Sequence, residues 1–338
     1  MSRIGSIVRT ALFTNGDTNL WLIPIILVIV VGSFIFWKKK TNKKRIRWLW
    51  LFVLVLVSIG IVVKDTTVFS TTLSGLITNK ETVSNKTNAT NDKKNVHTNH
   101  SEIKRELRTA WQSVDQKDSG EFAIAILQND GQVVSYTTTQ STFATASIVK
   151  VSIAAELLHN NAMAQVTLSS TQADLLTAMI EESDNDAATT LLTNDLGGYS
   201  SLSAIYQALA MTNTTVDTDA WGYTQTTAED QLKLLSAIFE PSDYLTTNSQ
   251  TYLQTLMNTV TDSQVWGISQ GAANVYLKNG WLQDEDGWIV NSIGKFDLDK
   301  AGKESYLIAV LTKNNPTFAD GQALIEKLTA KTNAVLSK

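Results

Sequence analysis

Two long apolar segments near the N-terminus constrain this chain more than any other feature. Residues 20–37 and 48–63 contain no charged side chain and are 18 and 16 residues long. At ~1.5 Å per residue, the longer segment spans about 27 Å as a helix, close to the hydrocarbon thickness of a bilayer. Trp21 and Trp37 lie at its two ends, as in the aromatic belts of membrane helices. The sequence therefore predicts two transmembrane helices, and a membrane anchor over residues 1–64.

The loop between these segments predicts their orientation. Residues 38–47 carry seven positive charges in ten positions and no acidic side chain. Basic loops stay on the cytoplasmic side, so everything after Lys64 is expected outside the cytoplasm. The alternative is a cleaved signal peptide, which has a single short apolar core. Two apolar segments around a basic loop favour a helical hairpin in the lipid bilayer.

The charges divide the chain into two parts. Residues 1–100 hold 14 basic and 4 acidic side chains, a balance of +10, whereas residues 101–338 hold 14 and 28, a balance of −14. An acidic C-terminal part argues against nucleic-acid binding, which needs a basic face. Thr, Asn and Ser fill 18 of the 36 positions in residues 65–100. This composition predicts a flexible linker between the anchor and a folded domain over residues 101–338.

The residue inventory limits the chemistry of that domain. The chain has no cysteine, which excludes a disulfide framework, a thiolate zinc site and a cysteine nucleophile. Of its three histidines, His97 and His100 fall in the predicted linker. Only His159 lies in a segment expected to fold, and its helix position puts it too far from Ser147 to act as its base. We expect a function that needs no metal and no cofactor.

The order of hydrophobic patterns predicts the fold class. A helix over residues 102–116 precedes two strands joined by the turn at Asn129–Gly131, and a mainly helical block follows. Three more strands and a last helix complete the chain. We therefore expect an α/β (α+β) fold: one antiparallel sheet, with the terminal helices on one face and the inserted helices forming a second lobe. The strands are expected at residues 121–127, 132–139, 274–278, 287–294 and 305–312, the helical block at 147–239 and the last helix at 318–336.

The segment Ala146–Lys150 offers a nucleophile and a base. Ser147 and Lys150 lie three positions apart, which in a helix places the hydroxyl and the amine on one face. A serine needs a base to attack a carbonyl, and a partly buried lysine can serve. The helix N-terminus would also offer backbone N–H groups to an oxyanion. Taken alone, an N-cap serine followed by a surface lysine is the ordinary interpretation of this pattern, although the apolar residues around Lys150 favour a buried lysine.

Two further motifs follow in the chain. Ser183-Asp184-Asn185 ends a helical segment, and Lys278-Asn279-Gly280 follows an expected strand. A helix end and a turn are their ordinary interpretations. In this order, however, S-x-x-K, S-D-N and K-x-G are the signature of class A β-lactamases and penicillin-binding proteins. Residues 101–338 resemble that family of serine hydrolases, and the expected order of strands and helices agrees with its fold.

The resemblance implies a role for each motif residue. Ser147 would be the acylated nucleophile, Lys150 its proton acceptor, and Ser183 the donor of a proton to the leaving nitrogen. Asn185 would hold the substrate amide, and Lys278 would attract a substrate carboxylate. The backbone N–H groups of Ser147 and Trp281 would form the oxyanion hole. Gly280, the glycine of the third motif, would let substrate approach the strand.

The sequence departs from the family in two places. Asn279 stands where the third motif usually has Thr or Ser. The glutamate that activates the deacylating water in class A enzymes has no counterpart in the loop after the second motif. Asp217 and Asp219 are the carboxylates of that loop and the candidates for this role, although solvated loop acids are the ordinary interpretation. We therefore expect deacylation to be slow.

Three functions remain open at this point. The first is hydrolysis of β-lactams or related amides through a Ser147 acyl-enzyme. The second is a D,D-peptidase of the penicillin-binding type that acts on peptidoglycan stem peptides, which the membrane hairpin favours. The third is a non-catalytic ectodomain that binds wall peptides. Acylation of Ser147 separates the first two from the third.

Overall fold

The computed structural model describes residues 88–114 and 120–337, with side chains described from His100 onward. The two predicted transmembrane segments lie outside these ranges, so the membrane anchor stays a prediction. In the ranges just given, no helix is long and apolar enough to cross a bilayer.

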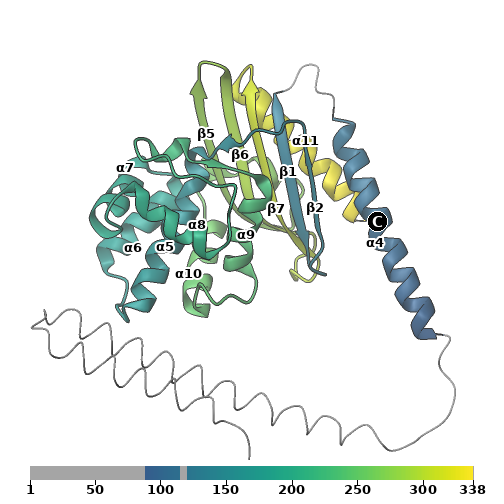
Figure 1. The fold of residues 1–338 in the computed structure, drawn as a ribbon, viewed down its shortest axis with the longest axis horizontal. Helices are drawn as coiled ribbons and strands as arrows, with labels where there is room; N and C mark the ends of the chain where they lie inside the picture. The colour runs from purple at the N-terminus through teal and green to yellow at the C-terminus, as the bar shows by residue number, and fades with distance from the viewer. Residues whose placement is uncertain (1–87, 115–119, 338) are drawn as a thin grey trace, which may run out of the picture. The chain divides into compact units, whose positions relative to one another are not determined.

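One five-stranded antiparallel sheet organises the domain (Figure 1). Its strand order is β2-β1-β7-β6-β5, so strands from the two ends of the domain pair at β1 and β7. The five predicted strands are all present, although β5 and its neighbours are longer than expected. Their bounds are Glu121–Gln128 for β1, Val133–Thr137 for β2, Asn274–Asp284 for β5, Gly287–Asp297 for β6 and Ser305–Asn315 for β7.

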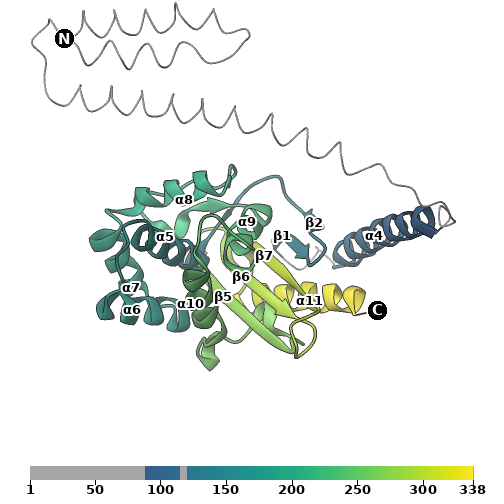
Figure 2. The ribbon, with the colours of Figure 1, turned by 90° about the horizontal axis from the view of Figure 1, so that it is seen from below.

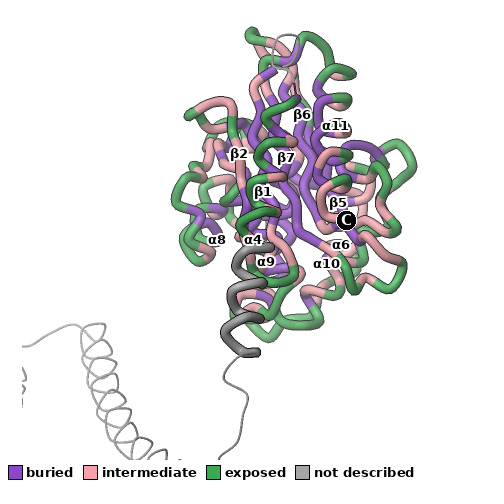
Figure 3. Tube along the Cα trace, turned by 90° about the vertical axis from the view of Figure 1, so that its right-hand side faces the viewer, coloured by how far each residue is buried: buried purple, intermediate pink, exposed green. Residues whose placement is uncertain are grey.

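Both faces of the sheet are covered, which explains the continuous apolar sequence of β1. Ile124 and Ile126 pack with the helices α4 (Asn88–Gln112) and α11 (Phe318–Leu336). Ala123 and Ala125 point to the opposite face, where their small side chains let α9 (Ala228–Phe239) of the helical lobe pack closely. Figure 2 shows α4 and α11 on one side of the sheet and the lobe on the other, and Figure 3 shows the buried strands between them. The predicted two-sided arrangement is confirmed.

The first helix begins earlier than predicted. Residues 88–100, expected to belong to a flexible linker, are helical in the structure, and α4 ends at Gln112 instead of residue 116. Leu107 and Trp111 are fully buried, and Trp111 donates a hydrogen bond to Thr332 of α11 at 2.9 Å. Because residues 88–112 contain no glycine or proline, the docked end can propagate the helix toward the N-terminus at little cost.

His100 takes part in this packing. Its Nε2 lies 3.1 Å from an Asp130 carboxylate oxygen, and its Nδ1 is 2.8 Å from Gln132 Nε2. Both partners lie at the β1–β2 turn, which begins near Asn129 as predicted. The last residues of the expected linker are therefore attached to the domain.

The helical lobe is built around α5 (Val149–Met163). Its first ten residues are all buried, including Lys150 and Glu156, so this helix is enclosed on every side. Helix α10 was not predicted, because polar residues dilute its apolar stripe. The other elements are β3 (Phe143–Ala144), η1 (Ala146–Ile148), α6 (Ser170–Thr177), η2 (Ala178–Glu182), α7 (Asn185–Thr190), η3 (Leu191–Asp195), η4 (Tyr199–Leu202), α8 (Ser203–Ala208), η5 (Trp221–Tyr223), β4 (Gln225–Thr226), α9 (Ala228–Phe239), α10 (Thr247–Asn258), η6 (Asp262–Gln264) and η7 (Gly267–Ser269).

Candidate active site

Ser147 and Lys150 meet where η1 runs into α5. Lys150 Nζ lies 2.9 Å from Ser147 Oγ, as the i, i+3 spacing predicts. Ala146 has a φ of 48°, a left-handed conformation that is uncommon for a residue with a Cβ. This local strain turns the chain from β3 into the helix directly before the serine. The hydroxyl and the amine are therefore held together by backbone geometry on a buried helix.

The second motif reaches the same amine from another helix junction. Ser183 is left-handed (φ 63°, ψ 33°), and Asp184 caps α7 by accepting a hydrogen bond from the Ala187 N–H at 2.6 Å. Lys150 Nζ donates to the Ser183 carbonyl at 2.6 Å and lies 3.2 Å from Ser183 Oγ. It also donates to Asn185 Oδ1 at 2.7 Å. The turn and cap together aim both motif side chains at Lys150.

The third motif brings a second lysine to the edge of the sheet. Lys278 on β5 is buried, and its Nζ donates to Ser183 Oγ at 2.8 Å and to the Asn279 carbonyl at 2.9 Å. Asn279 is also buried, and its Nδ2 donates to the Gln264 carbonyl at 2.7 Å. The residue that departs from the family motif thus binds a neighbouring loop of the same domain.

Both lysines are desolvated, and the charge of Lys150 also acts on Lys278. Burial lowers the pKa of the Lys150 amine from 10.5 to about 8, and the Asp184 carboxylate partly opposes this shift. Burial also holds the pKa of Lys278 well below its ordinary value, with a further lowering by the charge of Lys150. A lysine with a pKa of about 8 is partly neutral at physiological pH and can accept a proton.

Gly280 lets β5 approach the Ser147 turn. A Cβ at this position would lie 2.6 Å from the Ser147 nitrogen and 2.7 Å from the Ile148 nitrogen. These are backbone atoms, which cannot move aside as a flexible side chain would. The predicted close approach at this glycine is present, but the group that fills the space is the turn that carries the serine.

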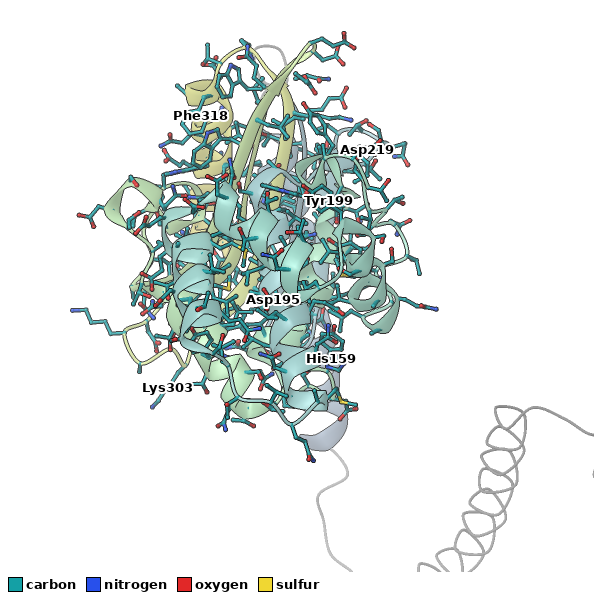
Figure 4. All side chains as sticks on the ribbon, turned by 90° about the vertical axis from the view of Figure 1, so that its left-hand side faces the viewer. His159, Asp195, Tyr199, Asp219, Lys303 and Phe318 are labelled. Carbon is teal, nitrogen blue, oxygen red and sulfur yellow. The ribbon has the colours of Figure 1, made fainter. Side chains whose placement is uncertain are left out.

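Trp281 follows at the exposed edge of the sheet. Its side chain is 37% exposed, and its ring centroid lies 5.8 Å from that of Trp266 and 5.6 Å from that of Phe318. Phe318 also packs edge-on against Trp288. The indole of Trp281 therefore belongs to an aromatic cluster at the start of α11, and Figure 4 labels Phe318 there.

The loop after the second motif carries Asp217 and Asp219, the two carboxylates considered for water activation. Asp217 Oδ1 accepts hydrogen bonds from the backbone N–H groups of Asp219 and Ala220, at 2.9 and 2.7 Å. Asp219 is exposed, and Figure 4 labels it at the rim of the molecule. The carboxylate of Asp217 thus shapes its own loop, and that of Asp219 faces solvent.

Trp221 is the residue of this loop that reaches the lysine. The Lys150 amine lies over its indole, 5.2 Å from the ring centroid. From the sequence, Trp221 is expected only as a core or cleft-wall residue. Trp221 follows the two loop acids and precedes the capped helix α9, which was the only hint in the sequence that it lies near the site. It is too far from Ser147 along the chain for any helix or strand periodicity to relate the two.

His159 lies at the far end of α5. Its Nδ1 donates to the Tyr244 carbonyl at 2.7 Å, and the two rings stack with centroids 4.0 Å apart. Figure 4 shows it at the opposite end of the lobe from Asp219. As expected, His159 is no base for Ser147.

Residues 162–336 match a known protein family. The model of the β-lactamase enzyme family matches residues 162–336, which include the second and third motifs. The chain belongs to the β-lactamase enzyme family. Membership makes it a serine hydrolase that acts on amide bonds. No curated protein sequence matches the chain significantly.

Solved structures agree with this family at the level of the fold. A class A β-lactamase from Bacteroides cellulosilyticus superposes with a TM-score of 0.61 at 20% identity, covering 69% of this chain and 98% of the other. The TLA-1 extended-spectrum β-lactamase superposes with a TM-score of 0.61 at 17% identity, covering 70% of this chain and 99% of the other. The structure of PBP-A superposes with a TM-score of 0.59 at 18% identity, covering 69% of this chain and 96% of the other. The β-lactamase fold thus accounts for most of the residues that the structure describes.

Proposed function

We propose that this domain opens β-lactams or related amides by forming an acyl-enzyme on Ser147, and that it releases the acyl group slowly. The observation that carries the proposal is the contact between the Ser147 hydroxyl and the Lys150 amine at 2.9 Å, with a lysine pKa of about 8. A neutral amine at hydrogen-bond distance is the base that a serine nucleophile needs.

The remaining residues supply the other steps of acylation. Ser147 Oγ attacks the carbonyl carbon and its proton passes to Lys150. The amide C–N bond then breaks, and the leaving nitrogen takes a proton through Ser183, whose hydroxyl touches both lysines. Asn185 Oδ1 is occupied by Lys150, which leaves its Nδ2 for a substrate carbonyl. Backbone N–H groups of Ser147 and Trp281 would stabilise the oxyanion.

Slow deacylation follows from the loop geometry. Asp217 Oδ1 is engaged by backbone N–H groups, Asp219 is exposed, and neither carboxylate hydrogen-bonds to Ser147 or Lys150, which supports slow activation of water at the acyl-enzyme. The same observation favours a second candidate, a D,D-peptidase that forms a long-lived adduct with β-lactams but acts on peptidoglycan stem peptides.

Intact mass spectrometry tests this function directly. The full-length chain in detergent is mixed with benzylpenicillin and followed over time, with Ser147→Ala as the control. We expect a persistent adduct of one penicillin that is absent from the variant. Rapid loss of the antibiotic with little adduct would contradict slow deacylation. Absence of both adduct and turnover would leave a wall-binding ectodomain as the better interpretation.

We also propose that the domain lies outside the cytoplasm on a two-helix membrane anchor. The two apolar segments and the basic loop at residues 38–47 support this topology. Because the chain has no cysteine, single cysteines can be placed at will. A membrane-impermeant maleimide should label Lys303→Cys in intact cells and should label Thr41→Cys only after lysis. The reverse pattern would exclude this topology.

A further inference from the structure

The Lys150 amine is enclosed by its neighbours. Four oxygen contacts surround it within 3.2 Å: Ser147 Oγ, the Ser183 carbonyl and hydroxyl, and Asn185 Oδ1. An ammonium group has only three N–H donors, so these oxygens already saturate it. The indole of Trp221 covers a further side at 5.2 Å. A water molecule that Lys150 could activate must therefore displace one of these groups.

Trp221 is held firmly in this position. Its Nε1 donates to Thr189 Oγ1 on α7 at 3.2 Å. The short helix η5 that contains it is attached to the strand before Ser147, since the Thr145 N–H donates to the Thr224 carbonyl at 2.8 Å and the Thr145 hydroxyl reaches the Gly222 carbonyl at 3.4 Å. The indole also packs against the hydrophobic core of the lobe. The loop is thus fixed to both sides of the site that it covers.

We propose that Trp221 is a positioning residue that closes the Lys150 side of the acyl-enzyme to water and thereby prolongs its lifetime. This inference rests on the proposed acylation of Ser147. Hydrolysis of the ester requires a water oxygen to bond to the acyl carbon while the bond from that carbon to Ser147 Oγ breaks. The water proton is taken by Lys150 and delivered to the serine oxygen. Lys150 hydrogen-bonds to Ser147 and neither loop aspartate does, so Lys150 is the base for this step, and Trp221 lies beside it.

The first experiment measures adduct lifetime. Wild type, Trp221→Phe, Trp221→Leu and Trp221→Ala are acylated with benzylpenicillin as full-length chains, freed of excess antibiotic, and followed by intact mass. All proteins are compared at a pH above their titration midpoints, where Lys150 is neutral, and uncovering the amine should then shorten the lifetime by at least about tenfold in the Leu and Ala variants. The Phe variant keeps an aromatic cover and should stay within about threefold of wild type. Trp221→Leu also retains apolar contact with the core if the Ala variant does not fold.

The second experiment measures the titration of Lys150 without any β-lactam. A fluorophosphonate reacts with a nucleophilic serine, and the pH dependence of its rate of labelling at Ser147 reports the titration of the base. Wild type should show a midpoint near pH 8, and Trp221→Leu a midpoint shifted upward toward 10.5, because hydration favours the charged amine. Trp221→Phe should keep the wild-type midpoint.

The outcomes separate the two proposals. If wild type forms adducts but the Leu and Ala variants keep its lifetime, or if the Leu variant keeps its midpoint, the role of Trp221 is wrong and the acyl-enzyme stands. If wild type reacts with neither reagent, both the acyl-enzyme and the role of Trp221 are overturned.

Discussion

The amine of Lys278 lies 2.8 Å from Ser183 Oγ, and the same hydroxyl is 3.2 Å from the amine of Lys150. One serine therefore stands between two buried lysines that come from a strand and a helix. Two ammonium groups at this separation repel each other, so the site favours a state in which one amine is neutral. This arrangement relates the ionisation of the site to both acylation and stability.

Lys150 should control the pH dependence of acylation. Its amine must be neutral to accept the proton of Ser147, so the rate of acylation by benzylpenicillin should rise with pH and level off above about pH 8. Lys150→Arg keeps a positive charge that does not titrate, and should lower the rate by about 10²–10⁴ above pH 8, where the wild-type amine is neutral, and by less at lower pH. Stopped mixtures analysed by intact mass measure these rates. A rate independent of pH between 6 and 10 would rule out Lys150 as the base.

Lys278 should make the folded state less stable at low pH than at high pH. Its folded pKa lies below its unfolded pKa, so the unfolded chain binds more protons between the two values and stability rises with pH there. Lys278→Met removes this proton binding. Thermal unfolding followed at pH 7 and at pH 10 should therefore show a smaller gain on raising the pH in the variant. Equal gains in both proteins would mean that Lys278 does not carry the shift.

Gly280→Ala should abolish acylation by displacing the nucleophile. The new Cβ would meet the Ser147 and Ile148 nitrogens at 2.6 and 2.7 Å, so β5 and the turn have to separate. We expect a loss of acylation of about 10²-fold or more, since small displacements of reacting groups are costly. Gly222→Ala is the matched control, because its Cβ would have its nearest neighbour at 3.8 Å. Comparable acylation by the two variants would contradict this account.

The loop aspartates should not set the lifetime of the acyl-enzyme through water activation. Asp219→Asn should keep the wild-type adduct lifetime, because its side chain is exposed. Asp217→Ala removes the acceptor for two backbone N–H groups and should lower stability by about 1–2 kcal/mol. Adduct decay and thermal unfolding measure the two effects. A much longer lifetime in Asp219→Asn would make that residue the deacylating base.

Several features of the site depend on short stretches of chain and could be predicted from them. The contact between Ser147 and Lys150 spans one helical turn, and the apolar segment that follows indicates that the lysine is buried. The second motif ends one helix and caps the next, which the polar sequence at Ser183–Asn185 indicates. Most elements of the sheet were also predictable, because apolar strands and turn residues have local signatures.

Other features arise only when distant segments pack. Residues 88–100 are helical because the following part of α4 docks on α11, and polar composition alone predicted a linker. Gly280 packs against the Ser147 turn, a contact between distant segments that no local pattern predicts. Trp221 covers Lys150 because β4 pairs with β3 and fixes the loop over the helix.

The order of the strands, the family motifs and the nucleophile–base pair follow from the amino-acid sequence alone, since each depends on neighbours along one helix or strand. Packing in three dimensions sets which groups surround that pair. Lys278 lies 95 residues from Ser183 and touches it only because the edge strand β5 passes beside the helical lobe. The desolvation that lowers the pKa of both lysines likewise comes from packing between segments that no local period relates.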